Sequence, residues 1–268
     1  MEITTMGGQP VSRLGLAGNP GMDRACAALA RQAGVDYFFF YNDSFTSMIE
    51  GVGEVLKENR EEVCVATGSE VRQRRALRRY LEQMQKRLDV DVVDLFFAEY
   101  VSPADDMDEV MEALEEFHRW KEEGTIRYVG ATVHSRELAV ELIECGRVEV
   151  LMHRYNMAHR GAEEKVLPAA LTGDLPVVAF TCTRWGSLLE GHRDWQGPVP
   201  NAGDCYRYAL HHPAVRLALT APKSAGQLRE NLAVFKDWGL AEEKKNTWEE
   251  YGALVYGDGR DSFETEWP

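Results

Sequence analysis

Short apolar runs alternate with longer segments of helical periodicity along almost the whole chain. Eight runs are too short for helices, and several are continuously apolar, which is typical of parallel strands covered on both faces. They occupy residues 11–17, 35–41, 62–68, 93–99, 126–132, 148–155, 175–182 and 215–221. Helical patterns fill the intervals between them, and several of these patterns end in a glycine, as helices commonly do: Gly34, Gly124, Gly146 and Gly239.

Eight strands alternating with eight helices predict an α/β fold, a (β/α)8 TIM barrel. A doubly wound open sheet is the alternative, but it would normally carry GxGxxG after its first strand, and none follows VSRLGLA. We expect one barrel domain over residues 1–268, with an N-terminal hairpin and an extra helix and tail from about residue 240. Ser135 and Asp204 are expected to cap the helices that follow them.

The charge balance narrows the classes of partner. Lys and Arg number 30 and Asp and Glu 44, a net charge of −14 that argues against nucleic-acid binding. One segment opposes this trend, the Arg-rich helical pattern at 71–88, which is either an anion or partner patch or an ordinary solvated helix face. The scattered cysteines form no CxxC pair, which argues against a zinc site. With neither a signal-peptide pattern nor an apolar run of membrane-spanning length, we expect a cytoplasmic protein that does not enter membranes.

One run, VDLFFAE at 93–99, ends in a carboxylate, Glu99. In a (β/α)8 barrel the chemistry lies at the carboxyl ends of the strands, so Glu99 is expected at the rim of the active site. A carboxylate buried there would have a raised pKa and could act as an acid. The alternative is a structural ion pair with an arginine such as Arg154.

Other polar residues follow the remaining strands. Tyr41 shares the strand parity of Phe39 and could point into the mouth, or it could simply pack in an aromatic strand. His134 could serve as a base. Arg184 and Trp185 suit an anionic or ring-shaped ligand, although a mouth-covering Trp and a salt-bridged Arg explain them as well.

Two further points concern the same rim. Asp43 is a loop carboxylate that could take part in substrate binding. Glu99, His134 and His153 do not form a convincing ligand set, so no metal is expected.

The order of motifs resembles that of the aldo-keto reductase superfamily over nearly the whole chain. The stretches that carry the resemblance are MGGQPVSRLGLAG, GVDYFFFYNDSF, EEVCVATG, YLEQMQKRLDVDVVDLFFAEY, MEALEEFHRWKEEGTIRYVGATVHS, VEVLMHRYNM and APKSAGQLRENLAVF. Members of the family transfer a hydride from a nicotinamide cofactor to a carbonyl carbon, using an Asp, a Tyr, a Lys and a His. The resemblance places these four on Phe39, Ser44, Gly68 and Glu99, so all four are changed here.

The resemblance also implies an NADP(H) site. Lys223 and Ser224 correspond to the residues that grip the 2′-phosphate, and Gln227 and Asn231 keep the spacing of the adenine contacts. Thr132 and Asn156 retain part of the nicotinamide contacts. Helix capping by Ser224 and a solvated Lys223 would be the structural explanation of the first pair.

Three functions remain open at this stage. The first is a divergent NADP(H)-linked oxidoreductase that acts on a small carbonyl or alcohol with a non-standard acid, Glu99 or Tyr41. The second is a non-redox lyase or isomerase that uses the same barrel mouth. The third is a non-catalytic regulatory or binding protein on this fold, which would have a protein partner.

Overall fold

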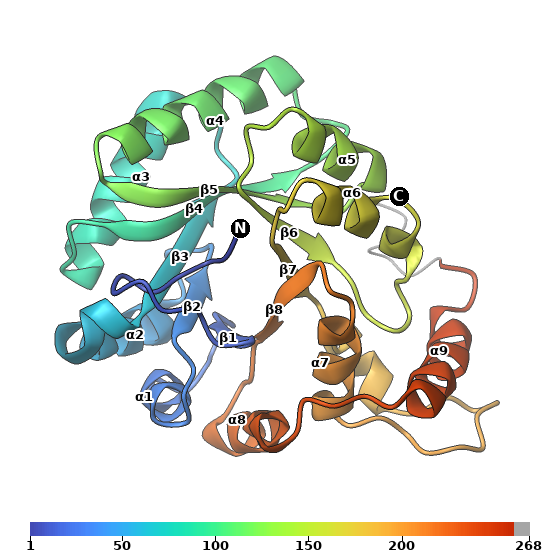
Figure 1. Cartoon of the computed structure of the whole chain (residues 1–268). Coiled ribbons are helices and arrows are strands. Elements are labelled where there is room, and N and C mark those ends of the chain that lie inside the picture. Colours follow the sequence, from blue (N-terminus) through green and yellow to red (C-terminus); the bar gives the residue numbers. More distant parts are fainter. Residues whose placement is uncertain (260–268) are drawn as a thin grey trace.

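The computed structural model describes residues 1–259, and in them eight parallel strands close into a barrel in chain order (Figure 1). Each strand falls within or nearly within one of the eight apolar runs, so the predicted (β/α)8 barrel is confirmed. The strands are β1 (Leu14–Ala17), β2 (Tyr37–Phe40), β3 (Cys64–Ser69), β4 (Val93–Val101), β5 (Ile126–Val133), β6 (Val150–Arg154), β7 (Val177–Phe180) and β8 (Val215–Thr220).

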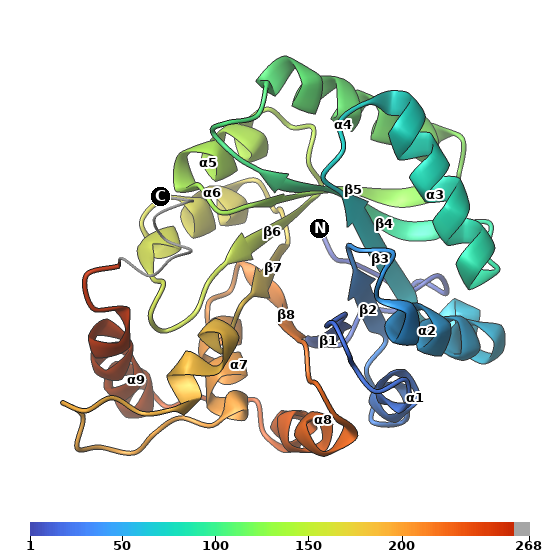
Figure 2. The same ribbon diagram turned by 180° about the vertical axis from the view of Figure 1, so that it is seen from behind.

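Helices surround the barrel, as Figures 1 and 2 show from opposite sides. They are α1 (Ala25–Gln32), α2 (Thr46–Asn59), α3 (Arg74–Leu88), α4 (Met107–Glu122), α5 (Arg136–Glu144), α6 (Val166–Thr172), α7 (Ala202–His211), α8 (Ala225–Leu232) and α9 (Glu242–Tyr256). Short 3₁₀ turns complete the connections: η1 (Arg60–Glu62), η2 (Gly161–Glu163), η3 (Arg184–Leu189) and η4 (Ala233–Lys236).

The Arg-rich segment forms α3, and its arginines lie on the outer face of that helix, as the solvated-face interpretation expected. Its buried stripe is Leu77, Leu81, Met84 and Leu88. On the outer face, Arg78 bonds Glu123 at 2.8 Å and approaches Glu116 at 3.5 Å. These pairs, with a further one between Arg74 and Glu112 at 3.6 Å, tie α3 to α4.

Two details of the predicted helices need correction. Ser135 caps α5 as expected. Asp204, however, is not the N-cap of α7. Asn201 is the N-cap, and the Asp204 side chain accepts a hydrogen bond from the Asn201 N–H, which completes a capping box. The helical pattern at 224–239 is not one helix, because it divides into α8 and the 3₁₀ turn η4.

The predicted extra helix beyond residue 240 is α9, which lies on the outside of the barrel near α6 and α7 (Figure 1). It is anchored to η3, where the Tyr251 hydroxyl donates to the Leu188 carbonyl at 2.9 Å. The rest of the expected tail, 260–268, lies outside the described residues. Within 1–259, no helix combines the length and the apolar character needed to cross a membrane.

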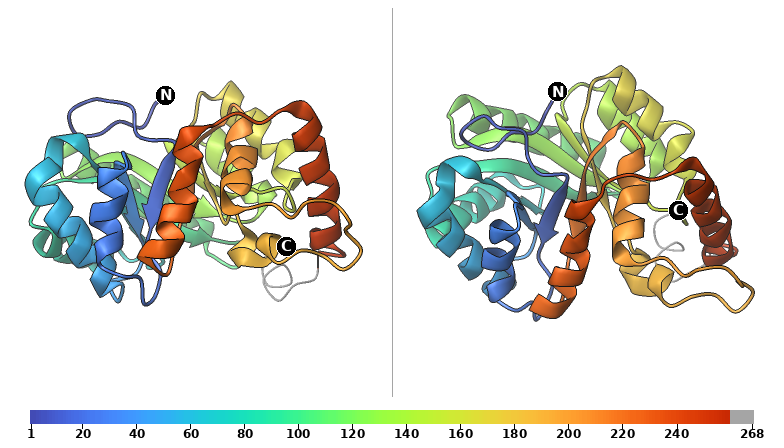
Figure 3. Two further views of the ribbon diagram at one scale, coloured as in Figure 1. Left: turned by 90° about the horizontal axis from the view of Figure 1, so that it is seen from below. Right: turned by 60° about the horizontal axis from the view of Figure 1, so that its bottom comes forward.

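The barrel interior is closed at its amino-terminal end by the chain's first residues. Ile3 packs into the interior cluster, and a single antiparallel bridge between Thr4 and Pro10 marks the predicted hairpin. Above Ile3, the interior is filled by aromatic and aliphatic side chains such as Tyr37, Phe39 and Phe97. Figure 3 shows the N-terminal segment on the side of the barrel opposite η3, which leaves the carboxyl ends of the strands for a site.

Candidate active site

Strand β4 carries Glu99 to the carboxyl end of the barrel but does not stop there. The pattern predicted an end at Glu99, whereas β4 continues to Val101 with an irregular register after Ala98. Tyr100 lies in this irregularity with φ of 51°, a left-handed conformation that is rare for a residue with a large side chain. Such irregularities in a strand re-aim side chains next to active sites.

The Glu99 side chain is almost completely buried, with 1% of its surface exposed. Burial raises its pKa to about 8, and Glu70 adds to the rise, while the Thr132 hydroxyl and Arg72 lower the pKa. Glu99 is therefore a neutral carboxylic acid at pH 7, a group that can donate a proton.

The expected alternative, an ion pair between Glu99 and Arg154, is wrong. Within residues 1–259 the Glu99 carboxylate has no ion-pair partner. The Arg72 guanidinium goes to other acceptors: Nη2 donates to the Glu99 carbonyl at 2.7 Å and to Asp105 Oδ2 at 3.4 Å, and Nη1 donates to the Ser69 carbonyl at 3.2 Å. The arginine thus fixes the backbone of the strand end and leaves the acid itself uncompensated.

Glu99 also covers the strand position to which the resemblance assigns the family's Lys. A Cβ at Gly68 would lie 2.7 Å from Glu99 Cγ and 2.7 Å from the Phe97 carbonyl oxygen, and closer still to Glu99 Oε1. Glycine at this position therefore leaves the space into which the carboxyl group folds. The position assigned to the family's Tyr, Ser44, is exposed, while Phe45 beside it turns inward against Tyr41 with ring centroids 5.2 Å apart.

Tyr41 and Glu99 line one hollow of about 370 Å³ at the mouth, together with Glu70, Arg72, Tyr100, Ser102 and Asp105. The structure therefore brings the two predicted acid candidates together. The Tyr41 and Tyr100 rings meet edge to face with centroids 5.8 Å apart. Sequence reasoning missed Tyr100, although its place directly after Glu99 at the end of an apolar strand was a usable signal.

His134, the third predicted catalytic residue, lies against Tyr100. The two rings stack with centroids 5.9 Å apart and planes 5° from parallel. Burial lowers the pKa of His134 to about 3, and the charges of Arg154, His153 and His159 lower it further. A histidine with this pKa is neutral at pH 7 and is a very weak base, so the predicted role as a general base is not favoured by its surroundings.

Three of the predicted cofactor residues share a second hollow, of about 360 Å³, between β7, η3, β8 and α8. Lys223, Gln227 and Asn231 line it together with Trp185, whose side chain is 55% exposed. The Thr181 hydroxyl also lines this hollow, and it is buried without a hydrogen-bond partner among residues 1–259. Lys223 forms no ion pair within the same residues, so a cation and an unsatisfied hydroxyl are available to a ligand.

The other three predicted cofactor residues lie elsewhere. Ser224 is the N-cap of α8 and accepts from the Gln227 N–H at 3.3 Å, the structural explanation that the sequence offered. Thr132 is buried beside Glu99. Asn156 is fully buried and braces the loop after β6, where it donates to the Thr181 carbonyl and accepts from the backbone N–H groups of Ala158 and His159, each at 2.9 Å.

The predicted substrate residues separate into three places. Arg184 is 7% exposed and directs Nη1 to the Val255 carbonyl of α9. Trp185 follows in the left-handed conformation, with φ of 54°, and belongs to the hollow that contains Lys223. Asp43 is exposed and turned outward, where its side chain accepts from Gln83 on α3 at 3.4 Å. Within residues 1–259, no group of three or more His, Cys, Asp or Glu side chains is placed to hold a metal ion.

Known proteins with similar sequences or structures are oxidoreductases and aldo-keto reductases. The model of the aldo/keto reductase family matches residues 40–204, which is well over half of the chain. An uncharacterized oxidoreductase of Bacillus subtilis (strain 168), YqkF, is 26% identical over 235 residues, which is 73% of this chain and 76% of YqkF. A second uncharacterized oxidoreductase of that organism, YrpG, is 31% identical over 134 residues, 47% of this chain and 38% of YrpG.

Among solved structures, the chain is similar to the aldo-keto reductase AKR11C1 from Bacillus halodurans. The holo form superposes with a TM-score of 0.78 at 21% identity, covering 97% of this chain and 100% of that one. The apo form gives a TM-score of 0.76 at 20% identity, with coverages of 97% and 98%. At this identity the likeness establishes the fold of the barrel.

Proposed function

The chain belongs to the aldo/keto reductase family, and from that premise we propose that it is an NADP(H)-linked oxidoreductase for a small carbonyl compound or alcohol, with Glu99 as its acid. The observation that carries this proposal is the buried Glu99 carboxyl group, whose pKa is raised to about 8, in the hollow that it shares with Tyr41. Carbonyl reduction needs a proton donor at the oxygen, and a neutral acid at the barrel mouth is such a donor.

The described residues fit a nucleotide cofactor in the hollow beside β8. Lys223 provides a cation for a phosphate, and Gln227 and Asn231 bring amide groups from α8. The exposed Trp185 ring offers a flat face for a base, and the Thr181 hydroxyl is a free hydrogen-bonding group within residues 1–259. When bound, a nicotinamide cofactor supplies or accepts the hydride.

The chain's own residues account for the proton. Glu99 holds a proton at neutral pH because its burial disfavours the anion. Tyr41 borders the same hollow and can orient the substrate oxygen or pass the proton on. Arg72 fixes the backbone carbonyls at the ends of β3 and β4, so Glu99 is held on a rigid strand end.

The first experiment measures cofactor binding and then turnover. NADPH should quench the tryptophan fluorescence. Lys223→Ala should weaken NADPH binding at least tenfold, because Lys223 is the one charged side chain among the described residues that line this hollow. In a screen of carbonyl substrates, Glu99→Gln should lower kcat by about 10²–10⁴-fold, the usual contribution of a general acid, and Tyr41→Phe by less. Asp43→Asn, at an exposed carboxylate outside the hollow, is the matched control.

The pH profile tests the same assignment. Because Glu99 must be protonated to donate, kcat/KM for reduction should fall as pH rises through about 8, and this fall should be absent from the residual activity of Glu99→Gln. Activity of Glu99→Gln equal to that of the unsubstituted protein would refute Glu99 as the acid.

A second candidate function is a cofactor-independent lyase or isomerase at the same hollow. The residues at the family's four catalytic positions favour it, because Phe39, Ser44 and Gly68 offer no ionisable group and only Glu99 does. Failure to bind NADPH at millimolar concentration would support this candidate, and the absence of any reaction would leave a non-catalytic binding protein.

A further inference from the structure

The outer helix α9 contacts two loops at the carboxyl end of the barrel, η3 after β7 and the loop after β6. Both loops help to form the hollow that contains Lys223. The Trp185 ring of η3 lines this hollow directly. In the β6 loop, Asn156 Nδ2 donates at 2.9 Å to the carbonyl of Thr181, which is another lining residue. Among the described residues, none on α9 lines the hollow itself, so the helix can act on it only through the two loops.

The backbone of η3 has an unusual conformation where it presents Trp185. Arg184 and Trp185 both have positive φ, of 49° and 54°, and Gly186 follows with 98°. The left-handed region is unfavourable for residues with a Cβ, and two such residues in succession are rare. The Gly186 N–H donates to the Thr183 carbonyl at 3.0 Å and closes the turn locally. Strain of this kind persists only where the surrounding structure determines it, and it gathers at ligand-binding sites.

Two hydrogen bonds join α9 to η3, one on either side of Trp185. Before it, Arg184 Nη1 donates to the Val255 carbonyl, so the first left-handed residue is tied to the helix. After it, the Tyr251 hydroxyl donates to the Leu188 carbonyl at 2.9 Å. Tyr251 and Leu188 are both completely buried, so water does not readily replace this bond if the hydroxyl is lost.

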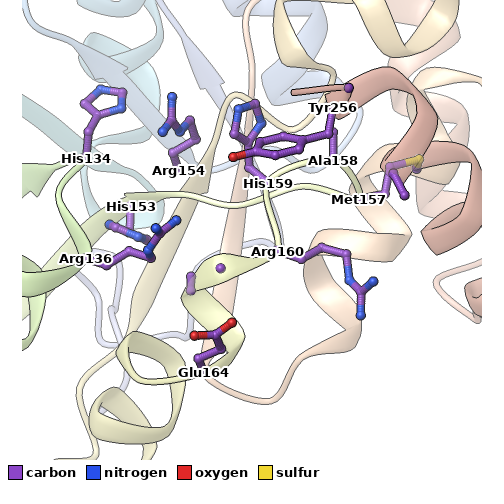
Figure 4. A pocket seen from close by; sticks show the side chains of 14 residues that line it. His134, Arg136, His153, Arg154, Met157, Ala158, His159, Arg160, Glu164 and Tyr256 are labelled. Carbon is purple, nitrogen blue, oxygen red and sulfur yellow. The ribbon is translucent and has the colours of Figure 1, made fainter. Parts of the chain in front are cut away.

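A close approach of backbones fixes α9 against the loop after β6. A Cβ at Gly252 would collide with the Met157 carbonyl group and lie 3.0 Å from the Ala158 nitrogen. Figure 4 shows this loop beside Tyr256 of α9, whose ring meets the His159 ring at nearly a right angle with centroids 5.5 Å apart. Glycine at position 252 thus lets the helix lie directly on the loop, and a side chain there would push α9 away together with its bonds to η3.

We propose that α9 is a positioning element of the cofactor hollow. Tyr251 and the Val255 carbonyl hold η3 in the conformation that places the Trp185 ring at the hollow, and Gly252 sets how closely the helix approaches the barrel. The effect on the cofactor rests on the proposed function, whereas the hold of α9 on η3 does not. A loop held in place needs no ordering when a ligand binds, so loosening α9 should weaken cofactor binding and spare the proton transfer at Glu99.

Fluorine NMR of the protein labelled with 5-fluorotryptophan tests the hold on η3 without any cofactor. Tyr251→Phe removes one hydroxyl and keeps the ring, and the Trp185 resonance, assigned with Trp185→Phe, should shift or broaden. Tyr256→Phe on the same helix is the matched control and should leave that resonance unchanged, because the Tyr256 hydroxyl makes no hydrogen bond within residues 1–259. The resonance of the fully buried Trp120 reports on the fold and should stay in place in both variants. An unmoved Trp185 resonance in Tyr251→Phe would overturn the proposal.

A second measurement tests the effect on the cofactor. Tyr251→Phe and Gly252→Ala should each raise the Kd for NADPH about five- to tenfold, since apparent affinity falls with the population of the competent loop. In both, kcat at saturating NADPH should stay within about twofold of that of the unsubstituted protein. Gly53→Ala, at a helical glycine whose Cβ has no contact below 3.9 Å, is the control for Gly252→Ala.

The outcomes separate positioning from general damage and from failure of the proposed function. An unchanged Kd in both test variants would overturn the positioning role. A fall in kcat as large as the rise in Kd would also overturn it, because it would indicate loss of structure and not a displaced loop. If the unsubstituted protein binds no NADPH, the proposed function fails together with the cofactor role of α9, while the fluorine spectra still decide whether α9 holds η3.

Discussion

Strand β4 carries a buried carboxylate near each end, and the two have opposite surroundings. Asp94, at the amino-terminal end of the barrel, is bound by Arg60 at 2.9 Å and by Arg127 at 2.8 Å, and it accepts the Val65 N–H at 2.8 Å. Glu99, at the carboxyl end, has no ion pair within residues 1–259, and the nearby Arg72 binds its carbonyl instead. Both carboxylates are almost completely buried.

The different surroundings of Asp94 and Glu99 indicate that one end of the barrel serves stability and the other serves chemistry. Arg127 also bonds the Thr4 carbonyl and hydroxyl, so the Asp94 group fastens the N-terminal segment over the barrel floor. At the other end an uncompensated acid is held neutral, which is unfavourable for stability once the pH rises and useful for proton donation. This is the division expected of (β/α)8 barrels, whose amino-terminal face serves stability and whose carboxyl-terminal face serves catalysis.

The largest effect is expected from Asp94→Asn. The substitution leaves two partly buried guanidinium groups without their counter-charge, and loss of one partner of a buried ion pair typically costs about 3–5 kcal/mol. Urea unfolding should give a destabilisation in that range, with Glu58→Gln, an exposed carboxylate on α2, as the control. A loss below about 1 kcal/mol would mean that the floor does not depend on Asp94.

The next effect concerns Glu99 and pH. Its folded-state pKa of about 8 lies above the unfolded value of 4.5, so between these values the folded state keeps a proton that the unfolded state has lost. The free energy of unfolding should therefore fall as pH rises from about 5 to 8, by about 3–4 kcal/mol, because one extra bound proton contributes about 1.36 kcal/mol per pH unit. Glu99→Gln should lack this loss, so the difference between the two proteins should change with pH; parallel curves would contradict the raised pKa.

A smaller effect is expected from Gly68→Ala, which probes the space that Glu99 occupies. The added Cβ meets the Phe97 carbonyl oxygen and the Glu99 side chain, and such overpacking costs about 1–3 kcal/mol. Gly53→Ala, in the middle of α2, is the matched control and should instead increase the stability. Its Cβ has no contact below 3.9 Å, and alanine favours the helix over glycine by about 0.5–1 kcal/mol. Unchanged stability of Gly68→Ala would show that the acid is not held against this glycine.

The details that sequence reasoning missed have identifiable causes. Asn201-Ala-Gly-Asp204 is itself a capping-box pattern, so the cap of α7 was readable and was assigned to the wrong residue. The extension of β4 through Tyr100 was not readable, because a strand irregularity depends on its partner strand. The direction of Arg184 was equally hidden, since its acceptor on α9 lies 71 residues further along the chain.

The sequence by itself determined the barrel, the carboxyl-terminal rim and the presence of Glu99, Tyr41 and His134 there, because hydrophobic periodicity and strand ends are local properties of the chain. Tertiary structure decided which of these residues share a hollow, and that Tyr100, which lines the hollow of Glu99 and Tyr41, stacks on His134. It also decided that the Glu99 acid is neutral while Asp94, five residues earlier, is bound by two arginines. The reason is that burial and the approach of charges from distant segments set the state of a carboxyl group, and neither is encoded in its immediate neighbours.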